Sequence, residues 1–174
     1  LITPDDSRYE QARTVSAAGI DRRPAAIVRV ANASDVSRLV LFARDNGIEL
    51  AVRSGGHSLA GHGVTEGGIV LDLSGMKDLQ ITRKELTAWA ETGLTAGEYT
   101  FAAAEHGLAT GFGDTASVGI GGITLGGGVA GMEAALGWSR GKGSRQCLYM
   151  VSSGVSPRKG PAPVSPSNMT TPKE

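Results

Sequence analysis

Two glycine-rich segments hold the residues that could bind a ligand. Residues 53–63 read RSGGHSLAGHG, and the paired Gly55 and Gly56 allow a tight turn that directs backbone N–H groups toward one point. Such a nest favours an anion, typically phosphate. Residues 119–128 read GIGGITLGGG and carry no charge, so a large planar or phosphorylated ligand could approach their backbone closely. Taken alone, each segment is better explained by tight turns in a glycine-rich fold.

Two other matches to known patterns lack the residues that those patterns require. Residues 126–131 fit G-x-G-x-x-G, but no acidic residue between Glu133 and Glu174 could bind a ribose as in a Rossmann site. Residues 137–141 fit the G-x-S-x-G pattern of α/β-hydrolases, yet no Asp or His follows Ser139 to complete a triad. A nicotinamide site is therefore not expected, and a hydrolase ranks last among the candidate functions.

Metal and disulfide chemistry are not expected either. His57 and His62 share a loop, but no cysteine and no fixed carboxylate accompanies them as a metal ligand. The single Cys147 can form neither an internal disulfide nor a cysteine zinc site.

Composition excludes several classes of partner. The chain has 174 residues, 17 basic and 17 acidic, and only 5% of them are aromatic. Balanced charge gives no electrostatic attraction to nucleic acid or anionic lipid, and few aromatic side chains are available to stack on bases. The uncharged stretch 115–132 is too rich in glycine and small polar residues to span a membrane. No nucleic-acid or membrane partner is therefore expected.

The elements that position residues 53–63 follow from periodicity. Residues 25–30 predict a buried strand, and residues 48–52 alternate as a second strand does. Between them, apolar residues recur with helical spacing, with Asn32 or Ser34 as the N-cap and Gly47 at the end. The second strand of this βαβ unit leads directly to the glycine-rich segment that begins at Arg53.

Further along, three more strands and one helix are expected. The strands are residues 69–73, 79–82 and 86–90, the last two separated by a polar turn. Thr95 and Glu98 fit a capping box that opens a helix running to about His106, with Gly107 as its stop.

The chain divides near residue 130. Residues 1–130 carry a net charge of −4 and residues 131–174 a net charge of +4, and five of the seven prolines lie in 157–172. Such a composition buries little apolar area, so 152–174 is expected to be disordered and 131–174 to be an atypical Pro/Ser-rich tail. Within residues 1–130, we expect a βαβ subdomain over about 22–72 and a second subdomain over about 73–130.

Five motifs occur in an order that resembles a known family. Arg-Pro-Ala stands before the first strand, and RSGGHS, IVLDLS, HGLATG and SVGIGGITLGGG follow. Over residues 2–129 the chain is similar to the FAD-binding domain of the p-cresol methylhydroxylase/vanillyl-alcohol oxidase superfamily, in its berberine-bridge-enzyme-like branch. The resemblance implies an α+β, PCMH-type fold in which two small α/β subdomains, the second incomplete, enclose FAD.

The resemblance also implies which residues hold the cofactor. In such enzymes the loop that matches residues 54–58 binds the FAD pyrophosphate, and the histidine that matches His57 is bonded to the flavin. Thr115 stands where some relatives have a second flavin-linking cysteine, so a single link is expected. The implied cofactor-binding residues are Arg53, Ser54, Gly55, Gly56, His57, Ser58, Gly63, Thr115, Ser117, Gly119 and Gly122.

The implied activity is that of a flavin-dependent oxidase. Such enzymes move hydride from a C–OH or C–N carbon of a sugar, alkaloid or alcohol to flavin, and then pass the electrons to molecular oxygen. After Val129 the family pattern stops, so the substrate domain is absent and the chain is expected to be an inactive fragment or to have an altered reading frame. Its catalytic residues are unknown.

Two alternatives remain open beside the hydrolase. One is the FAD subunit of a molybdenum hydroxylase, in which FAD would not be covalently bound. The other is a non-catalytic nucleotide-binding fragment. Residues 1–11 show no signal-peptide pattern, so a cytoplasmic location is expected, although the chain begins at Leu1 and its N-terminus is expected to be incomplete.

Overall fold

Three short parallel strands form the first sheet of the computed structural model, which describes residues 1–126, 145–146 and 148–152. They are β1 (Ala26–Arg29), β2 (Leu50–Arg53) and β3 (Ile69–Asp72), in the order β1-β3-β2. All four residues of β3 are buried, which explains why its apolar residues run without alternation.

Strand β3 completes the sheet of the predicted βαβ unit. The expected strand, helix and strand are present, but β3 lies between β1 and β2, so these two strands do not pair. The central place suits β3 because it is buried throughout. Strand β2 lies at an edge of the sheet, and its Val52 side chain is 54% exposed there.

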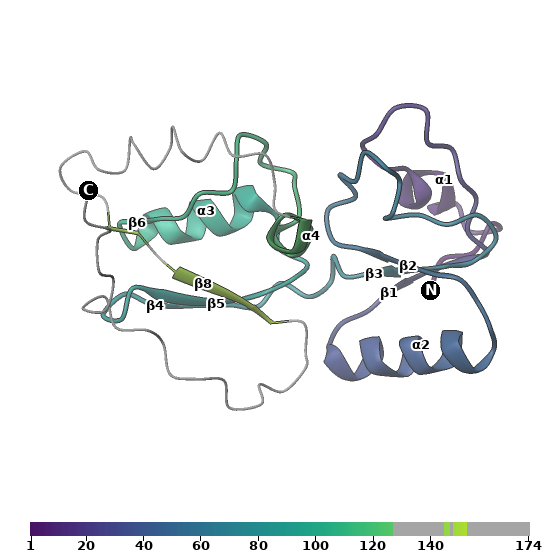
Figure 1. The fold of residues 1–174 in the computed structure, drawn as a ribbon, viewed down its shortest axis with the longest axis horizontal. Helices are drawn as coiled ribbons and strands as arrows, with labels where there is room; N and C mark the ends of the chain where they lie inside the picture. Colours follow the sequence, from purple (N-terminus) through teal and green to yellow (C-terminus); the bar gives the residue numbers. More distant parts are fainter. Residues whose placement is uncertain (127–144, 147, 153–174) are drawn as a thin grey trace, which may run out of the picture.

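Helices α1 (Tyr9–Arg13) and α2 (Ala33–Asp45) cover opposite faces of this sheet (Figure 1). Tyr9 packs with Ile27 and Val70 on one face. Val36 and Leu39 of α2 pack on the other face against a cluster that contains Leu71. We call the sheet with these two helices the first subdomain.

The ends of α2 agree with the sequence. Of the two candidate caps, Asn32 is the one used: its side chain accepts a hydrogen bond of 3.0 Å from the Asp35 N–H. Gly47 follows the helix with a φ of +63°, a conformation that glycine adopts without strain.

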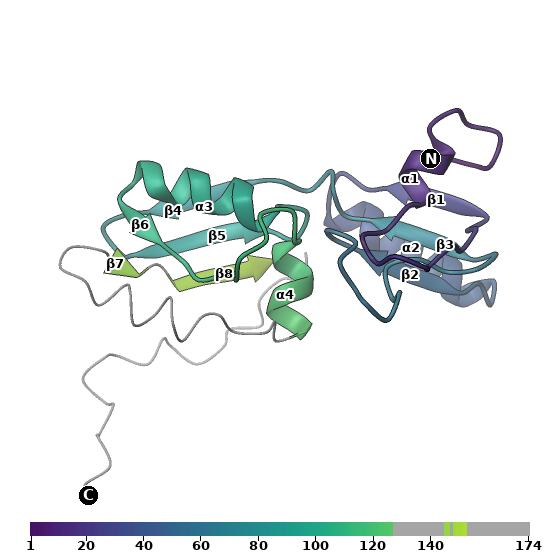
Figure 2. The ribbon, with the colours of Figure 1, turned by 90° about the horizontal axis from the view of Figure 1, so that it is seen from above.

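The second sheet is mixed. Strands β4 (Leu79–Thr82) and β5 (Thr87–Glu91) form an antiparallel hairpin, as predicted, and β8 (Leu148–Ser152) pairs with β5 in parallel. A small parallel pair joins β6 (Leu108–Ala109) to β7 (Arg145–Gln146). This sheet, with helices α3 and α4 described next, makes the second subdomain (Figure 2).

Helix α3 (Ala96–Glu105) begins with the predicted capping box. Thr95 accepts from the Glu98 N–H, and the Glu98 carboxylate accepts from the Thr95 N–H at 2.9 Å. Tyr99 is fully buried, and its ring meets that of Phe112 edge-on at 5.0 Å. This aromatic pair anchors the segment that leads to the glycine-rich residues.

The segment 111–131 carries no helix signal, yet part of it forms helix α4 (Ile120–Gly126). Each glycine in a helix interior costs about 1 kcal/mol relative to alanine. Packing offsets this cost, because Ile120 is fully buried and Gly121 lies so close to Thr92 that an added Cβ would be 3.0 Å from the Thr92 Cβ.

Most of the predicted tail, residues 131–174, lies outside the described residues. Within it the structure describes only the strands β7 and β8, which pair with β6 and β5. Among the helices of the described residues, none has the length and apolar character needed to cross a membrane.

The two subdomains meet at a pair of glycines. A Cβ added to Gly119 would overlap the Gly55 nitrogen and the Ser54 hydroxyl, and one added to Gly55 would lie 2.9 Å from the Ser117 carbonyl oxygen. Beside this contact the Ser54 hydroxyl donates a hydrogen bond of 2.5 Å to the Thr92 carbonyl. Glycine is therefore required at both positions for close backbone approach.

Gly119→Ala should destabilise the protein, because the new methyl group must force the subdomains apart. Overpacking of this kind costs about 1–3 kcal/mol in the free energy of unfolding, which urea denaturation measures. Gly122→Ala is the matched control: nothing lies within 4 Å of its added Cβ. Because alanine is the better helix former, that variant should gain up to about 1 kcal/mol. Equal effects of the two substitutions would contradict the proposed contact.

Candidate functional site

A cavity of about 760 Å³ lies between the two subdomains. This is within the range of about 300–1,000 Å³ that is usual for small-molecule and cofactor sites. One wall is the segment that follows β2, and the other is the segment from Phe112 through α4.

Ten of the eleven residues predicted from the sequence line this cavity, and Ser117 is the exception. The ten are Arg53, Ser54, Gly55, Gly56, His57, Ser58, Gly63, Thr115, Gly119 and Gly122. The fold therefore brings together two segments that are about 60 residues apart in the chain.

The first wall is a loop in which several backbone N–H groups have no hydrogen-bond acceptor among the described residues. Gly56 and Gly61 have φ values of +72° and +75°, a backbone conformation that glycine adopts without strain. Across the described part of the chain, no acceptor is found for the backbone N–H groups of Gly55, Gly56, His57 and Ser58. Backbone donors without an acceptor suit an anion, so this loop remains a candidate for the nest that the glycine pair predicts.

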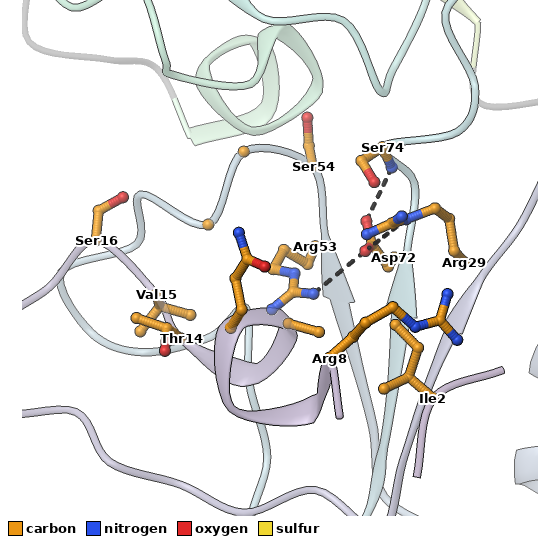
Figure 3. A pocket seen from close by; sticks show the side chains of 14 residues that line it. Ile2, Arg8, Thr14, Val15, Ser16, Arg29, Arg53, Ser54, Asp72 and Ser74 are labelled. Atoms are coloured by element: carbon orange, nitrogen blue, oxygen red, sulfur yellow. Dashed lines mark hydrogen bonds and ion pairs between the residues drawn. The ribbon is translucent and has the colours of Figure 1, made fainter. Parts of the chain in front are cut away.

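The Arg53 side chain supports the loop from beneath. Its aliphatic stem packs so closely that Cβ atoms added to Gly56 and Gly63 would each lie 3.5 Å from it. Its guanidinium group points to Asp72 at the end of β3, with Nη2 at 3.3 Å from Oδ2 (Figure 3). Arg53 is only 7% exposed. It therefore borders the cavity mainly as a buried support.

Asp72 is held in its ionised form. Burial raises the pKa of its carboxyl group, but hydrogen bonds from Ser74 and the charges of Arg53 and Arg29 outweigh burial and lower the pKa below its ordinary value of 3.8. The Ser74 N–H donates to Oδ1 at 2.9 Å.

His57 and Ser117 face each other across the two walls. The Ser117 hydroxyl lies 3.0 Å from His57 Nε2, although the residues are 60 positions apart. If Nε2 carries the proton and donates to Ser117, Nδ1 keeps a lone pair and can act as a nucleophile. His57 is partly buried and Ser117 is exposed, so both can be reached by a ligand.

The second wall contains apolar residues that the sequence did not single out. Phe112, Val118 and Ile123 line the cavity, and Asp114 is the acidic residue beside them. Phe112 is buried through its contact with Tyr99, which is long-range and leaves no trace in the local pattern. His62, which shares the loop with His57, is exposed and also lines the cavity.

Within the residues that the structure describes, no three His, Cys, Asp or Glu side chains gather in a way that could hold a metal ion.

The pattern of residues over this fold matches one protein family. Residues 24–142 match the FAD binding domain family. The chain belongs to this family. The predicted resemblance is confirmed, and so is the PCMH-type α+β fold, in which two small subdomains pack against each other.

Relatives of this FAD binding domain are FAD-linked oxidoreductases. It is 39% identical to (R)-6-hydroxynicotine oxidase of Paenarthrobacter nicotinovorans over 129 residues, which are 74% of this chain and 28% of that protein. It is 33% identical to berberine bridge enzyme-like 10 of Arabidopsis thaliana over 110 residues, 61% of this chain and 21% of that protein. The chain thus spans less than a third of the length of these curated relatives.

Solved structures show the same fold. The FAD binding domain superimposes on 6-hydroxy-D-nicotine oxidase from Arthrobacter nicotinovorans with a TM-score of 0.68 at 37% identity, over 70% of this chain and 27% of that one. Glucooligosaccharide oxidase from Acremonium strictum gives 0.65 at 26% identity, over 70% and 26% of the two chains. The latter is described as carrying a 6-S-cysteinyl, 8α-N1-histidyl FAD.

The cavity fits the cofactor of this family. Four N–H groups on one wall have no acceptor among the described residues and suit a pyrophosphate. Phe112, Val118 and Ile123 on the other wall suit a planar aromatic ring. The close contact of Gly55 with Gly119 at the cavity edge sets the spacing between the two walls.

Asp72→Asn should destabilise the domain at pH 7. Removing the charge leaves Arg53 buried without a counterion, and breaking a buried pair costs about 3–5 kcal/mol. Since the folded pKa of Asp72 is depressed, its stabilising effect is complete above the ordinary value of 3.8 and is lost as the pH falls through the folded pKa. Urea denaturation should therefore show a difference between variant and parent that shrinks below about pH 4.

Asp35→Asn provides the comparison for this measurement. Asp35 pairs with Arg38 on the exposed side of α2, and exposed pairs contribute at most about 1 kcal/mol. If the Asp72→Asn variant proves as stable as the Asp35→Asn variant, the ion pair of Asp72 with Arg53 does not stabilise the loop after β2.

Proposed function

We propose that this chain is the FAD-binding part of a flavin-dependent oxidoreductase, with FAD in the cavity between the subdomains and bonded to His57. The observation that carries the proposal is the position of His57, whose ring lies at the cavity and contacts Ser117 of the opposite wall. The family match and the oxidoreductase relatives support it, as does the histidyl FAD of glucooligosaccharide oxidase.

Each wall of the cavity contacts a different part of FAD. The N–H groups of Gly55, Gly56 and Ser58 donate to the pyrophosphate, and the loop needs no lysine or magnesium for this purpose. Phe112 and Ile123 pack against the aromatic ring system and exclude water from that side. Thr115 lacks a thiol, so His57 provides the only protein bond to the flavin among the predicted residues.

His57 forms that bond as a neutral nucleophile. In the FAD-loaded protein, His57 would supply the ring nitrogen that bonds to the benzenoid methyl carbon of the flavin, and Ser117 would hold Nε2 through its hydrogen bond. Formation of this bond would release two protons to solvent, one from the methyl group and one from the imidazole. It would also leave two electrons on the flavin for molecular oxygen to remove.

In the whole protein, FAD supplies the chemistry: it accepts hydride from a C–OH or C–N carbon of a small molecule, and oxygen then takes the electrons. The relatives named for hydroxynicotine and glucooligosaccharide oxidation support this substrate class. The described residues bind and orient the flavin.

Acid precipitation of the FAD-loaded protein tests the bond. The yellow colour should stay in the pellet for the parent and for His62→Ala, because His62 lines the same cavity without facing Ser117. For His57→Ala all the colour should move to the supernatant. If acid releases the flavin from the parent, FAD binds without a covalent bond and the proposed link to His57 is wrong. If the parent binds no flavin before acid is added, the whole proposal is overturned.

Ser117→Ala should slow the attachment of flavin without changing FAD affinity much. The loss of one charge-assisted or neutral hydrogen bond corresponds to about 1–2 kcal/mol, or roughly a tenfold slower rate. The rate is measured by adding FAD to the apoprotein and quenching with acid over time. Ser117→Thr keeps the hydroxyl and should restore most of the rate. If Ser117→Ala reacts as fast as the parent, Ser117 does not orient His57.

A further inference from the structure

A second cavity, of about 690 Å³, lies at the carboxyl ends of the three parallel strands (Figure 3). The described residues that line it run from Ile2 to Ser74, so it borders the first subdomain and the near side of the loop after β2. The carboxyl edge of a parallel sheet is where open α/β folds place their ligands.

Three charged residues form a row along this edge. Arg29, Asp72 and Arg53 end β1, β3 and β2, and the strand register sets Asp72 beside both arginines. Each arginine contacts the same oxygen, Asp72 Oδ2, at 3.3 Å. The other oxygen accepts the Ser74 N–H. One carboxylate thus balances two guanidinium groups, and the row keeps one positive charge.

One nitrogen of this positively charged row has no hydrogen-bond acceptor among the described residues. Arg53 Nη1 is buried and, within the described part of the chain, has no hydrogen-bond partner. A guanidinium group is always protonated, and a buried charged donor without a partner is costly. Arg8 from the N-terminal segment lines the same cavity, and its exposed side chain forms an ion pair with the partly buried Asp6.

The remaining wall is apolar with a few hydroxyl groups. Ile2, Ala12 and Val15 line it, together with Thr14 and Ser16. Such a wall accepts an organic body but does not bind an isolated, strongly hydrated ion by itself.

We propose that this cavity is a second binding site, for a small organic anion. Its carboxylate or phosphate group binds Arg29 and Arg53, whose planar guanidinium groups match oxyanions, and its apolar body lies against Ile2 and Val15. This cavity shares Arg53, Ser54, Gly55 and Gly56 with the FAD cavity, but Arg29, Asp72 and the N-terminal residues line only this one.

The test is a titration of the full chain with benzoate and with inorganic phosphate, followed by amide chemical shifts, with and without saturating FAD. Both probes should shift residues 8–16 and 72–74 whether or not FAD is present. Arg29→Gln should weaken binding about tenfold or more, as expected for the loss of a charge-assisted hydrogen bond. The Arg29 side chain is half exposed, so this variant should remain folded, as its melting temperature will show.

Arg38→Gln is the matched control, since Arg38 makes one exposed ion pair on α2 and does not line this cavity. It should bind both probes as the parent does. Displacement of the probes by FAD, with Arg29→Gln unaffected, would place the anion in the nest after β2 and overturn the proposal. An absence of shifts in residues 8–16 would overturn it as well.

Discussion

The contact between Gly55 and Gly119 is the constraint on which the other features of the site depend. Two backbones touch there, and any side chain would separate them. The adjacent hydrogen bond from Ser54 to the Thr92 carbonyl fixes the same junction. Because the two walls are held at this spacing, His57 comes within hydrogen-bond distance of Ser117 and a cavity forms between the walls. Gly55 and Gly119 are thus needed for the close approach of the two backbones rather than for chain flexibility.

Arg53 links the two cavities. Its aliphatic stem packs against Gly56 and Gly63 and so supports the loop that lines the cavity between the subdomains. Its guanidinium group joins the charged row with Asp72 at the edge of the sheet. The chain as a whole has no net charge, yet this one edge carries an excess positive charge. Two means of anion recognition, backbone donors and guanidinium groups, therefore lie on either side of one short segment.

Local signals predicted the local structure well. The capping box at Thr95, the Asn32 cap and the glycine at 47 each satisfy a nearby backbone group, so their spacing in the chain is enough to recognise them. Features that depend on contacts between distant residues could not be predicted in this way. The insertion of β3 between β1 and β2 is one example, and the helix α4 is another, because burial of Ile120 outweighs the low helix propensity of its glycines. The candidate site residues came from a family resemblance, and the burial of Arg53 against Asp72 emerged only from the fold.

The central claim is that FAD occupies the cavity between the subdomains, and hydrogen exchange of the backbone amides with and without FAD tests it most directly. The account predicts that FAD slows exchange in residues 54–63 and 112–122 together, since one ligand contacts both walls. Residues 33–45 of α2, which lie away from the cavity, should exchange at the same rate in both samples. Protection confined to one wall, or protection elsewhere in the domain while FAD is bound, would contradict it.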